Sequence, residues 1–380
     1  MIGNELQLDN FSGNHFEMGI KQGSTYKNKI YNTWEIFTKM EFVGALKPKM
    51  IPNRIFFYMA KNKATKTYKD IIERYAPNQA QRIRGISEGS GIDLKTLYLA
   101  QSAEPLLTRA GAKYTIPAAG CTSIGILPEK SASGETIIAR NFDLFTAFIP
   151  MYVGRYNKIG NGFSNIDFSV CAFAGSFHGM NEKGLTITYD LAYPIDGLKS
   201  GVPISILIQE ALEKYKTTEE TIKFFKESLL GNGAILLVGD SLGDVRTLEI
   251  SCNQIGIRKP KNGFIVNTNH FLTKEMKLVD VPENAVYSEG PLVGKRVRES
   301  TERRYERVYT VISNSKKVST ESLKNTMRDH GIDQKSSRYT ICVHSPLIST
   351  TMSIIFDLSK RTISALIGNP CESEYKQFSF

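Results

Sequence analysis

The sequence lacks the marks of several common protein classes. Its longest apolar runs, such as Ala234 to Val238, are far shorter than the roughly 20 residues that a membrane-spanning helix needs. Met1 to Asn10 has neither the basic start nor the apolar middle of a secretion signal. We therefore expect a soluble, cytoplasmic protein.

Cysteine is scarce and scattered. The five cysteines are odd in number, no two of them have the C-x-x-C spacing of a metal or redox site, and the five histidines form no H-E-x-x-H motif. The sequence therefore predicts neither a metal site nor a cofactor. Apart from Cys121, discussed below, the cysteines at 171, 252, 342 and 371 are expected to be small apolar residues.

A nucleic-acid module is also missing, although the net charge is +10. The basic residues form short separate groups, such as Lys61 to Lys69, Arg258 to Lys261 and Arg303 to Arg307, without interleaved stacking aromatics. We expect no nucleic-acid partner, and interpret these charges as solvated faces that also attract anionic substrates.

No low-complexity or Pro-rich linker divides the 380 residues. Leu6 to Phe16 is typical of a strand that leads into a helix. Tyr26 to Tyr75 has apolar residues every three or four positions, with a break around Pro48 to Pro52. Two further helices are predicted at Gln79 to Asp93 and Leu94 to Ser102, so the first 110 or so residues are mainly helical.

After Gly120 the pattern changes to alternating, β-branched and aromatic runs. Strands in blocks, separated by pairs of helices, favour an α+β fold with two stacked, largely antiparallel sheets between helical layers. Strands are predicted at 121–127, 136–141, 151–156, 167–174, 185–191, 234–240, 245–251, 254–258, 264–267, 339–344, 352–357 and 362–367, and helices at 204–215, 218–229, 303–313 and 320–328.

Cys121 has neighbours that indicate chemistry. Gly120 has no side chain to block attack of the thiol on its carbonyl, so an N-to-S acyl shift can form a thioester, which water hydrolyses. The chain break leaves Cys121 with a free α-amine, whose unperturbed pKa is roughly 7.7 to 8.0 and which can act as the general base for the thiol. Taken alone, the pair would favour a plain buried cysteine at a strand edge.

Elements on both sides of Cys121 resemble a known family. Cys121-Thr122-Ser123, a hairpin and then Arg140-Asn141-x-Asp143 resemble the N-terminal nucleophile hydrolases of the choloylglycine hydrolase and penicillin V acylase type. Over nearly the whole chain, the best likeness is to the acyl-coenzyme A:6-aminopenicillanic acid acyltransferase group. Its G-x-x-Y/F-E-x-G-x-x-x-G and G-I-A-E-G-like elements match Gly13 to Gly23 and Gly85 to Gly89.

The resemblance implies a four-layer αββα N-terminal nucleophile hydrolase fold that cleaves itself between Gly120 and Cys121. Residues 1–120 would be a mainly helical pro-segment and residues 121–380 the catalytic domain, with the two chains remaining associated. Asn269, in a T-N-H-F-like string, would be the side-chain donor of the oxyanion hole, worth roughly 2.7 to 4 kcal/mol in the transition state. Arg304 would be the active-site arginine, and the backbone oxyanion donor would lie near Tyr189 to Leu191.

The end of the hairpin's second strand carries three polar residues to which chemical roles can be assigned. Asp143 is a carboxylate suited to bind the α-ammonium of Cys121, and the positive charge of Arg140 lowers the thiol pKa. Asn141 can orient either group. The stretch Phe142 to Tyr152 is interpreted either as an acyl pocket or as core, and the candidate substrate-binding residues are Asn141, Phe145, Phe148, Tyr189 and Asp190.

One departure from the family affects the predicted reaction. The acyltransferase group has a Q-N-W-D-like string where this chain has Arg140 to Asp143, which favours hydrolysis of a linear amide over transfer to a β-lactam nucleus. We therefore predict a self-processing cysteine amidase acting on N-acyl amines or N-acyl amino acids. The alternatives are an acyl-coenzyme A-dependent N-acyltransferase and an uncleaved, non-catalytic binding protein of the same fold; association into homo-oligomers stays open.

Overall fold

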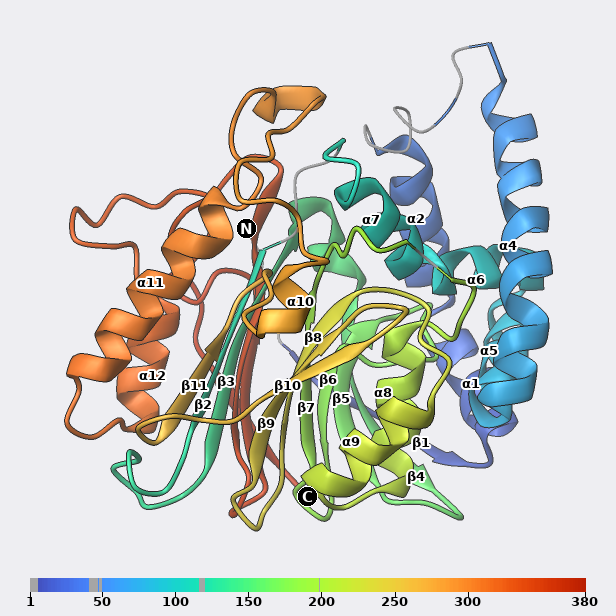
Figure 1. The fold of residues 1–380 in the computed structure, drawn as a ribbon. Helices are drawn as coiled ribbons and strands as arrows, with labels where there is room; N and C mark the ends of the chain where they lie inside the picture. The colour runs from blue at the N-terminus through green and yellow to red at the C-terminus, as the bar shows by residue number, and fades with distance from the viewer. Residues whose placement is uncertain (1–5, 41–46, 48–49, 116–119, 198) are drawn as a thin grey trace.

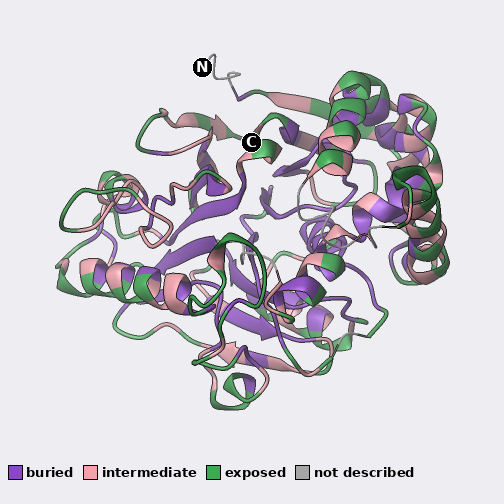
Figure 2. Cartoon of the chain, turned by 90° about the horizontal axis from the view of Figure 1, so that it is seen from above, coloured by how far each residue is buried: buried purple, intermediate pink, exposed green. Residues whose placement is uncertain are grey.

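Two β-sheets lie face to face at the centre of the molecule, with helices on both outer sides (Figure 1). The computed structural model describes residues 6–40, 47, 50–115, 120–197 and 199–380. The strands are mostly buried, whereas the helices expose their outer sides (Figure 2). The predicted α+β class with four αββα layers is confirmed.

The larger sheet has eight strands within the described residues, in the order β1-β4-β5-β6-β7-β8-β9-β10. Its neighbouring strands are antiparallel except for β1 and β4, which run parallel. The bounds are β1 Leu8–Gly13, β4 Tyr152–Ile159, β5 Asn165–Val170, β6 His178–Asn181, β7 Thr186–Leu191, β8 Ala234–Gly239, β9 Val245–Ile250 and β10 Ile255–Arg258.

The smaller sheet has six described strands in the order β11-β2-β3-β12-β13-β14, and all of its pairs are antiparallel. Strands β2 and β3 form the predicted hairpin, and they pack across the interior against β7 and β8. The bounds are β2 Gly120–Ile126, β3 Ile137–Phe145, β11 Phe264–Asn267, β12 Ile348–Asp357, β13 Thr362–Ile367 and β14 Lys376–Ser379.

Each sheet has a pair of helices on its outer face (Figure 1). Helices α11 (Glu299–Asn314) and α12 (Thr320–Met327) cover the smaller sheet, and α8 (Ile204–Lys214) and α9 (Thr218–Glu227) cover the larger one. The predicted start of α9 is confirmed, because Thr217 and Glu220 form a reciprocal capping box. The short α10 (Lys274–Lys277), η1 (Thr146–Met151) and η2 (Gly290–Leu292) lie in connections.

The N-terminal segment is helical after β1, as expected. Its described helices are α1 (His15–Thr25), α2 (Lys27–Lys39), α4 (Asn53–Tyr75), α5 (Pro77–Ser90), α6 (Leu94–Gln101) and α7 (Ala103–Gly111). Because β1 adds an edge strand to the larger sheet beside β4, this segment is part of the same folded body as the rest of the chain.

The two glycine-containing elements that carry the family resemblance pack against each other. Gly19 of α1 and Gly85 of α5 face one another so closely that an added Cβ would lie 2.3 Å from the Arg82 carbonyl oxygen or 2.2 Å from that of Phe16. Only glycine permits this approach of two backbones. The two sequence elements are therefore the two halves of one helix crossing.

Strand alternation divides the residues of β2 between two environments. Ile124 and Ile126 belong to the apolar cluster that also contains Val308 and Ile312 of α11. Cys121, an odd-numbered residue of the same strand, belongs instead to the main core between the sheets. Since successive side chains of a strand point to opposite faces, the register of β2 places the Cys121 thiol in the interior.

One predicted strand is wrong. Within the described chain, residues 339–344 form turns and a single bridge between Ser337 and Val343 instead of a strand. In a strand the backbone oxygens of this segment would accept hydrogen bonds from a neighbouring strand. Here side chains occupy two of them: Asn141 Nδ2 donates to the Ile341 oxygen at 3.0 Å, and Thr340 Oγ1 donates to the Cys342 oxygen at 2.6 Å. In addition, strands β6 and β14 and helix α7 had not been predicted from the sequence.

No helix in the described part of the chain is both long and apolar enough to cross a lipid bilayer. This finding agrees with the absence of long apolar runs from the sequence.

Candidate active site

Cys121 is the second residue of β2, between β11 and β3, and it is completely buried. The strand runs through Gly120 and Cys121 without a break, so the geometry is that of the uncleaved chain. Polar groups from three separate segments converge on the sulfur, the amide nitrogen and the carbonyl oxygen of this one residue.

Arg140 contacts the sulfur. Its Nη2 lies 3.4 Å from Cys121 Sγ and also donates to the Tyr189 carbonyl oxygen, and its Nε lies 3.2 Å from Asp190 Oδ1. The guanidinium further contacts Nδ1 of His178, whose pKa burial lowers well below its ordinary value, so that the ring is neutral. Arg140 is therefore held rigidly beside the thiol.

The Arg140 charge lowers the pKa of the thiol, as expected, but not enough to keep the thiolate populated in the uncleaved chain. Burial raises the pKa of Cys121 to about 11, and the Arg140 charge opposes this rise without cancelling it. In the uncleaved chain the sulfur is therefore a neutral thiol near pH 7.

Asn269 contacts the nitrogen of Cys121. Its Oδ1 accepts a hydrogen bond from this nitrogen at 2.7 Å and a second one from Arg304 Nη2 at 2.9 Å. Its Nδ2 donates to the Leu191 carbonyl oxygen at 2.8 Å. Two donors on one side and an acceptor on the other fix the orientation of the amide. Nδ2, the atom expected to bind the oxyanion, is thus occupied in this structure.

Arg304 reaches the site from α11, which covers the outer face of the smaller sheet. It is buried, and its Nη1 donates to the carbonyl oxygen of Cys121 and to Thr122 Oγ1, the latter at 2.9 Å. The structure therefore brings Arg304, Asn269 and Arg140 around Cys121, although they are far apart in the sequence.

Asp143 has one carboxylate oxygen bound and the other without a partner. Thr350 Oγ1 donates to Oδ1 at 2.6 Å, while the buried Oδ2 has no hydrogen-bond partner among the described residues. A Cβ added to Gly120 would lie only 2.8 Å from this Oδ2. Burial raises the pKa of Asp143, opposed mainly by the Arg304 charge.

The other predicted site residues lie in different surroundings. Asn141 points away from the thiol, toward α12, and its Nδ2 donates to the Met327 and Ile341 carbonyl oxygens. Asp190 is buried and accepts from Ser123 Oγ at 2.6 Å as well as from Arg140; burial raises its pKa to about 6. Phe145 packs edge-on against Phe148.

A cavity of ≈ 680 Å³ lies between the N-terminal helices and the strands that carry the site. Phe142, the cross-strand partner of Cys121, lines it together with Tyr189 and Leu191. From the helical side it is lined by apolar residues of α2, α4, α6 and α7, including Trp34, Phe57, Leu97, Ala100 and Leu107, and Phe148 of η1 is also at its wall. Its size is in the usual range for small-molecule sites.

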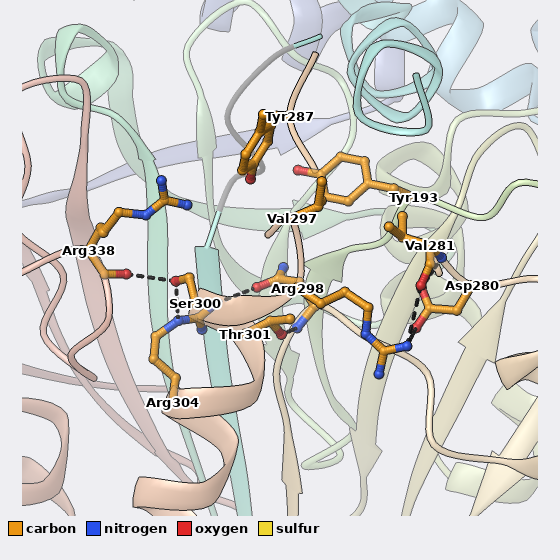
Figure 3. A pocket seen from close by; sticks show the side chains of 11 residues that line it. Tyr193, Asp280, Val281, Tyr287, Val297, Arg298, Ser300, Thr301, Arg304 and Arg338 are labelled. Carbon is orange, nitrogen blue, oxygen red and sulfur yellow. Dashed lines mark hydrogen bonds and ion pairs between the residues drawn. The ribbon is translucent and has the colours of Figure 1, made fainter. Parts of the chain in front are cut away.

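A second, much smaller pocket of ≈ 20 Å³ lies beside Asn269 and Arg304 (Figure 3). Its wall includes several polar side chains: Arg298, Ser300 and Thr301 come from the start of α11, and Arg338 from the loop that follows α12. Ser300 Oγ donates to the Arg338 carbonyl oxygen at 2.6 Å. A pocket of this size and polarity can hold about one water molecule.

Several residues of the network had not been predicted. Thr350 binds Asp143, Thr301 binds the backbone nitrogen of Asn269 at 2.7 Å, and His178 contacts Arg140. No motif marks them, because they reach the site from strands and helices distant in sequence. Ser123, which donates to Asp190, could have been predicted: it is two residues after Cys121 in the same strand, so its side chain points to the same face of the sheet.

A family model described as acyl-coenzyme A:6-aminopenicillanic acid acyl-transferase matches residues 130–372, more than half of the chain. The chain belongs to this acyl-transferase family. The predicted resemblance is thereby confirmed. The acyl-transferase match includes Arg140, Asp143, Asn269 and Arg304, whereas Gly120 and Cys121 lie before its first residue.

Solved structures similar to this acyl-transferase family member include a variant of the conjugated bile acid hydrolase from Clostridium perfringens (14% identity, 68% of this chain and 97% of that chain, TM-score 0.42). Penicillin V acylase from Agrobacterium tumefaciens is 16% identical over 65% of this chain and 83% of its own, with a TM-score of 0.40. The Caenorhabditis elegans ortholog of N-acylethanolamine-hydrolyzing acid amidase is 14% identical over 63% and 93%, with a TM-score of 0.40.

Proposed function

We propose that this protein is a self-processing cysteine amidase that hydrolyses linear amides with an apolar acyl group. Residues 1–120 would be the small chain and residues 121–380 the large chain, with Cys121 as the nucleophile. Membership of the acyl-transferase family supports an amidase or acyltransferase type of activity.

One observation carries the proposal. Three atoms of the same residue are each held by a different side chain: Cys121 Sγ by Arg140, its nitrogen by Asn269 and its oxygen by Arg304. A plain structural cysteine does not need such a shell, and burying two guanidinium groups is costly unless they are paired.

The same side chains would serve self-cleavage, in the following steps. The Cys121 thiol gives up its proton and Sγ attacks the carbonyl carbon of Gly120; the bond to the Cys121 nitrogen then breaks, and this nitrogen takes up the proton that the thiol lost and leaves as an amine. Water then hydrolyses the thioester between Gly120 and Sγ, which restores the thiol and leaves a carboxylate on Gly120. The free Oδ2 of Asp143 beside Gly120 is available to bind the new α-ammonium of Cys121.

The same groups then serve the amidase reaction. The α-amine of Cys121 takes the thiol proton, and Sγ attacks the amide carbon of the substrate. The amine returns the proton to the leaving nitrogen, and a water molecule hydrolyses the acyl-enzyme. Asn269 holds the α-amine through Oδ1; to bind the oxyanion as well, its Nδ2 must leave the Leu191 oxygen.

The large cavity supports an extended apolar acyl group. Its walls are mainly aromatic and aliphatic. Two of its lining residues are close to Cys121: Phe142 is its cross-strand partner, and Arg140 joins Cys121 Sγ to the Tyr189 carbonyl oxygen. Since α2, α4, α6 and α7 form its other wall, the small chain must stay bound after cleavage. The β1–β4 pairing provides that association, together with hydrogen bonds from Gln22 of α1 to the Cys171 carbonyl oxygen and from Arg82 of α5 to Asn157.

Transfer to an amine is the second candidate, because the family is described as an acyl-transferase. Hydrolysis and transfer share the acyl-enzyme and differ in whether water or an amine attacks it. Acyl-coenzyme A would then be the acyl donor instead of an amide.

Intact mass and N-terminal sequencing of the purified protein test the self-cleavage. We expect two chains, the second beginning Cys121-Thr122-Ser123, and a single unbroken chain for Cys121→Ala. Cys252→Ala is the matched control, because this half-buried cysteine lies outside the site and should leave cleavage intact. An unbroken wild-type chain would favour the non-catalytic binding protein instead.

Acyl specificity is tested with acetyl, octanoyl and palmitoyl amides of the same amine. We expect kcat/KM to rise with acyl length, and Ala100→Phe, which fills the cavity from α6, to remove the gain while acetyl-amide turnover is kept. Product that forms only when acyl-coenzyme A and an amine are both supplied would support transfer, and equal turnover of all three amides would contradict the assignment of the cavity.

A further inference from the structure

Two cysteines and two histidines that are scattered in the sequence meet at one place. One ligand atom each from His330, Cys342, His344 and Cys371 lies within 4.8 Å of the other three. His330, Cys342 and His344 come from the loop between α12 and β12, and Cys371 from the turn after β13. None of them belongs to the candidate active site.

The separations are those of a tetrahedral metal site. The two sulfurs are 3.6 Å apart, and His344 Nε2 lies 3.3 Å from Cys342 Sγ and 3.2 Å from Cys371 Sγ. Zinc bonds of about 2.3 Å to sulfur and about 2.0 Å to nitrogen at tetrahedral angles require about 3.8 Å between sulfurs and about 3.6 Å between sulfur and nitrogen. The three separations among Cys342, His344 and Cys371 agree with these values to within a few tenths of an ångström, and the His330 ligand atom lies within 4.8 Å of the other three.

His330 has a ligand atom to offer. Its Nε2 is buried and has no hydrogen-bond partner among the described residues, although the ring packs edge-on against His344 at 5.1 Å between centroids. A buried polar atom without a partner is costly, and binding a metal would satisfy it. Asn369 Nδ2, 3.9 Å from Cys342 Sγ, provides an outer contact to one sulfur.

A disulfide is the simplest competing explanation for two neighbouring cysteines. Bonded sulfurs lie about 2.0 Å apart, much closer than the 3.6 Å between Cys342 and Cys371. A disulfide would also leave unexplained why His344 contacts both sulfurs.

We infer that His330, Cys342, His344 and Cys371 form a zinc site. The four protein ligands complete the tetrahedral shell and leave no open position for substrate, so the metal has a structural function. This inference differs from the sequence-based expectation of no metal site, because Cys371 lies 41 positions after His330 and only folding brings it to the other three residues.

The metal would fasten a loop that supports the active site. Val343 lies between two ligands, Cys342 and His344. Its backbone nitrogen donates a hydrogen bond to Thr350 Oγ1 at 2.9 Å. The same Thr350 hydroxyl donates to Asp143 at 2.6 Å. Ile341, on the other side of Cys342, is bound by Asn141 of β3. Zinc therefore stabilises the position of Asp143 from outside the site.

Metal content tests the inference directly. Protein purified from zinc-supplemented medium and dialysed should hold one zinc per chain by elemental mass spectrometry, and so should Cys252→Ser as the matched control. The zinc content of Cys371→Ser should be at least tenfold lower than that of the wild-type protein. Cobalt in place of zinc should give the intense visible bands of a tetrahedral thiolate site in the wild type and not in Cys371→Ser.

Stability provides a second readout that needs no variant to fold. A strong chelator should lower the unfolding midpoint of the wild-type protein and of Cys252→Ser, and added zinc should restore it. Cys371→Ser, altered at an exposed cysteine, should not respond. Absence of metal from the wild type, an unchanged midpoint with chelator, or a Cys342–Cys371 disulfide found by peptide mapping would overturn the inference.

Discussion

Asn269 Oδ1 accepts a hydrogen bond from the backbone nitrogen of Cys121 at 2.7 Å. This contact joins the start of β2 to the second residue after β11, and it places an amide oxygen against the atom that self-cleavage would turn into an α-amine. The same oxygen accepts from Arg304. In this structure Asn269 accepts a hydrogen bond from Cys121 through Oδ1, whereas binding an oxyanion would require it to donate through Nδ2.

Two substitutions of Asn269 separate these roles. Asn269→Asp keeps an acceptor for the Cys121 nitrogen but removes the Nδ2 donor, so we expect self-cleavage to proceed while kcat for amide hydrolysis falls by about 10²–10³. Asn269→Ala should impair both reactions. Asn253→Ala, at a loop away from the site, is the control. Unchanged kcat in Asn269→Asp would exclude oxyanion binding by this side chain.

Asp143→Asn should shift the pH dependence of hydrolysis. A neighbouring negative charge raises the pKa of an α-ammonium group, so its loss makes the Cys121 amine easier to deprotonate. The acidic limb of the kcat/KM profile, which reports the free amine as general base, should therefore move to lower pH, together with a lower maximum rate. A profile that keeps its acidic limb would show that Asp143 does not contact the amine.

Gly120→Ala should slow maturation without changing the mature enzyme. The added methyl group would lie 2.8 Å from Asp143 Oδ2 and 3.2 Å from Asp143 Cβ, and such overpacking typically costs about 1–3 kcal/mol. Cleavage, followed by intact mass, should be slower, while kcat per cleaved molecule stays at the wild-type value because residue 120 is in the other chain. Gly160→Ala, where no atom is near, serves as control.

The rate of self-cleavage should increase with pH. Burial raises the pKa of Cys121 to about 11, so the thiolate fraction, and with it the rate, should rise about tenfold per pH unit below that value. Chain that has been unfolded before cleavage and is then refolded at a series of pH values provides the measurement. A rate that is constant from neutral to alkaline pH would mean that thiol deprotonation does not limit the reaction.

Glu104 should make folding stability depend on pH. Burial raises its pKa from 4.5 to about 7, although Ser205 donates to its carboxylate from the start of α8. The folded chain therefore holds this proton more tightly than the unfolded one, and the contribution is lost as pH rises from about 4.5 to about 7. In the uncleaved Cys121→Ala protein, Glu104→Gln should flatten this decline in denaturant titrations.

The exposed Glu219→Gln is the control for that experiment, since it makes the same substitution on the protein surface. If Glu104→Gln retained the full decline between the two pH values, another buried carboxyl group such as Asp190 would be its source.

The sequence by itself determined the order of most helices and strands, because apolar periodicity and capping residues such as Thr217 act over a few neighbouring positions. It also indicated Cys121, through the adjacent Gly120 and the flanking family elements. It could not predict the course of residues 339–344, where the Asn141 side chain replaces the partner strand.

Tertiary structure alone decided which groups surround the thiol. Arg140 was expected to activate it, yet burial outweighs the charge, and burial depends on how the two sheets pack. Asn269 and Arg304 contact Cys121 only because β11 pairs with β2 and α11 lies across the outer face of the same sheet. The His330, Cys342, His344 and Cys371 cluster has the same origin: local sequence specifies the elements, whereas contacts between distant residues exist only once those elements are packed.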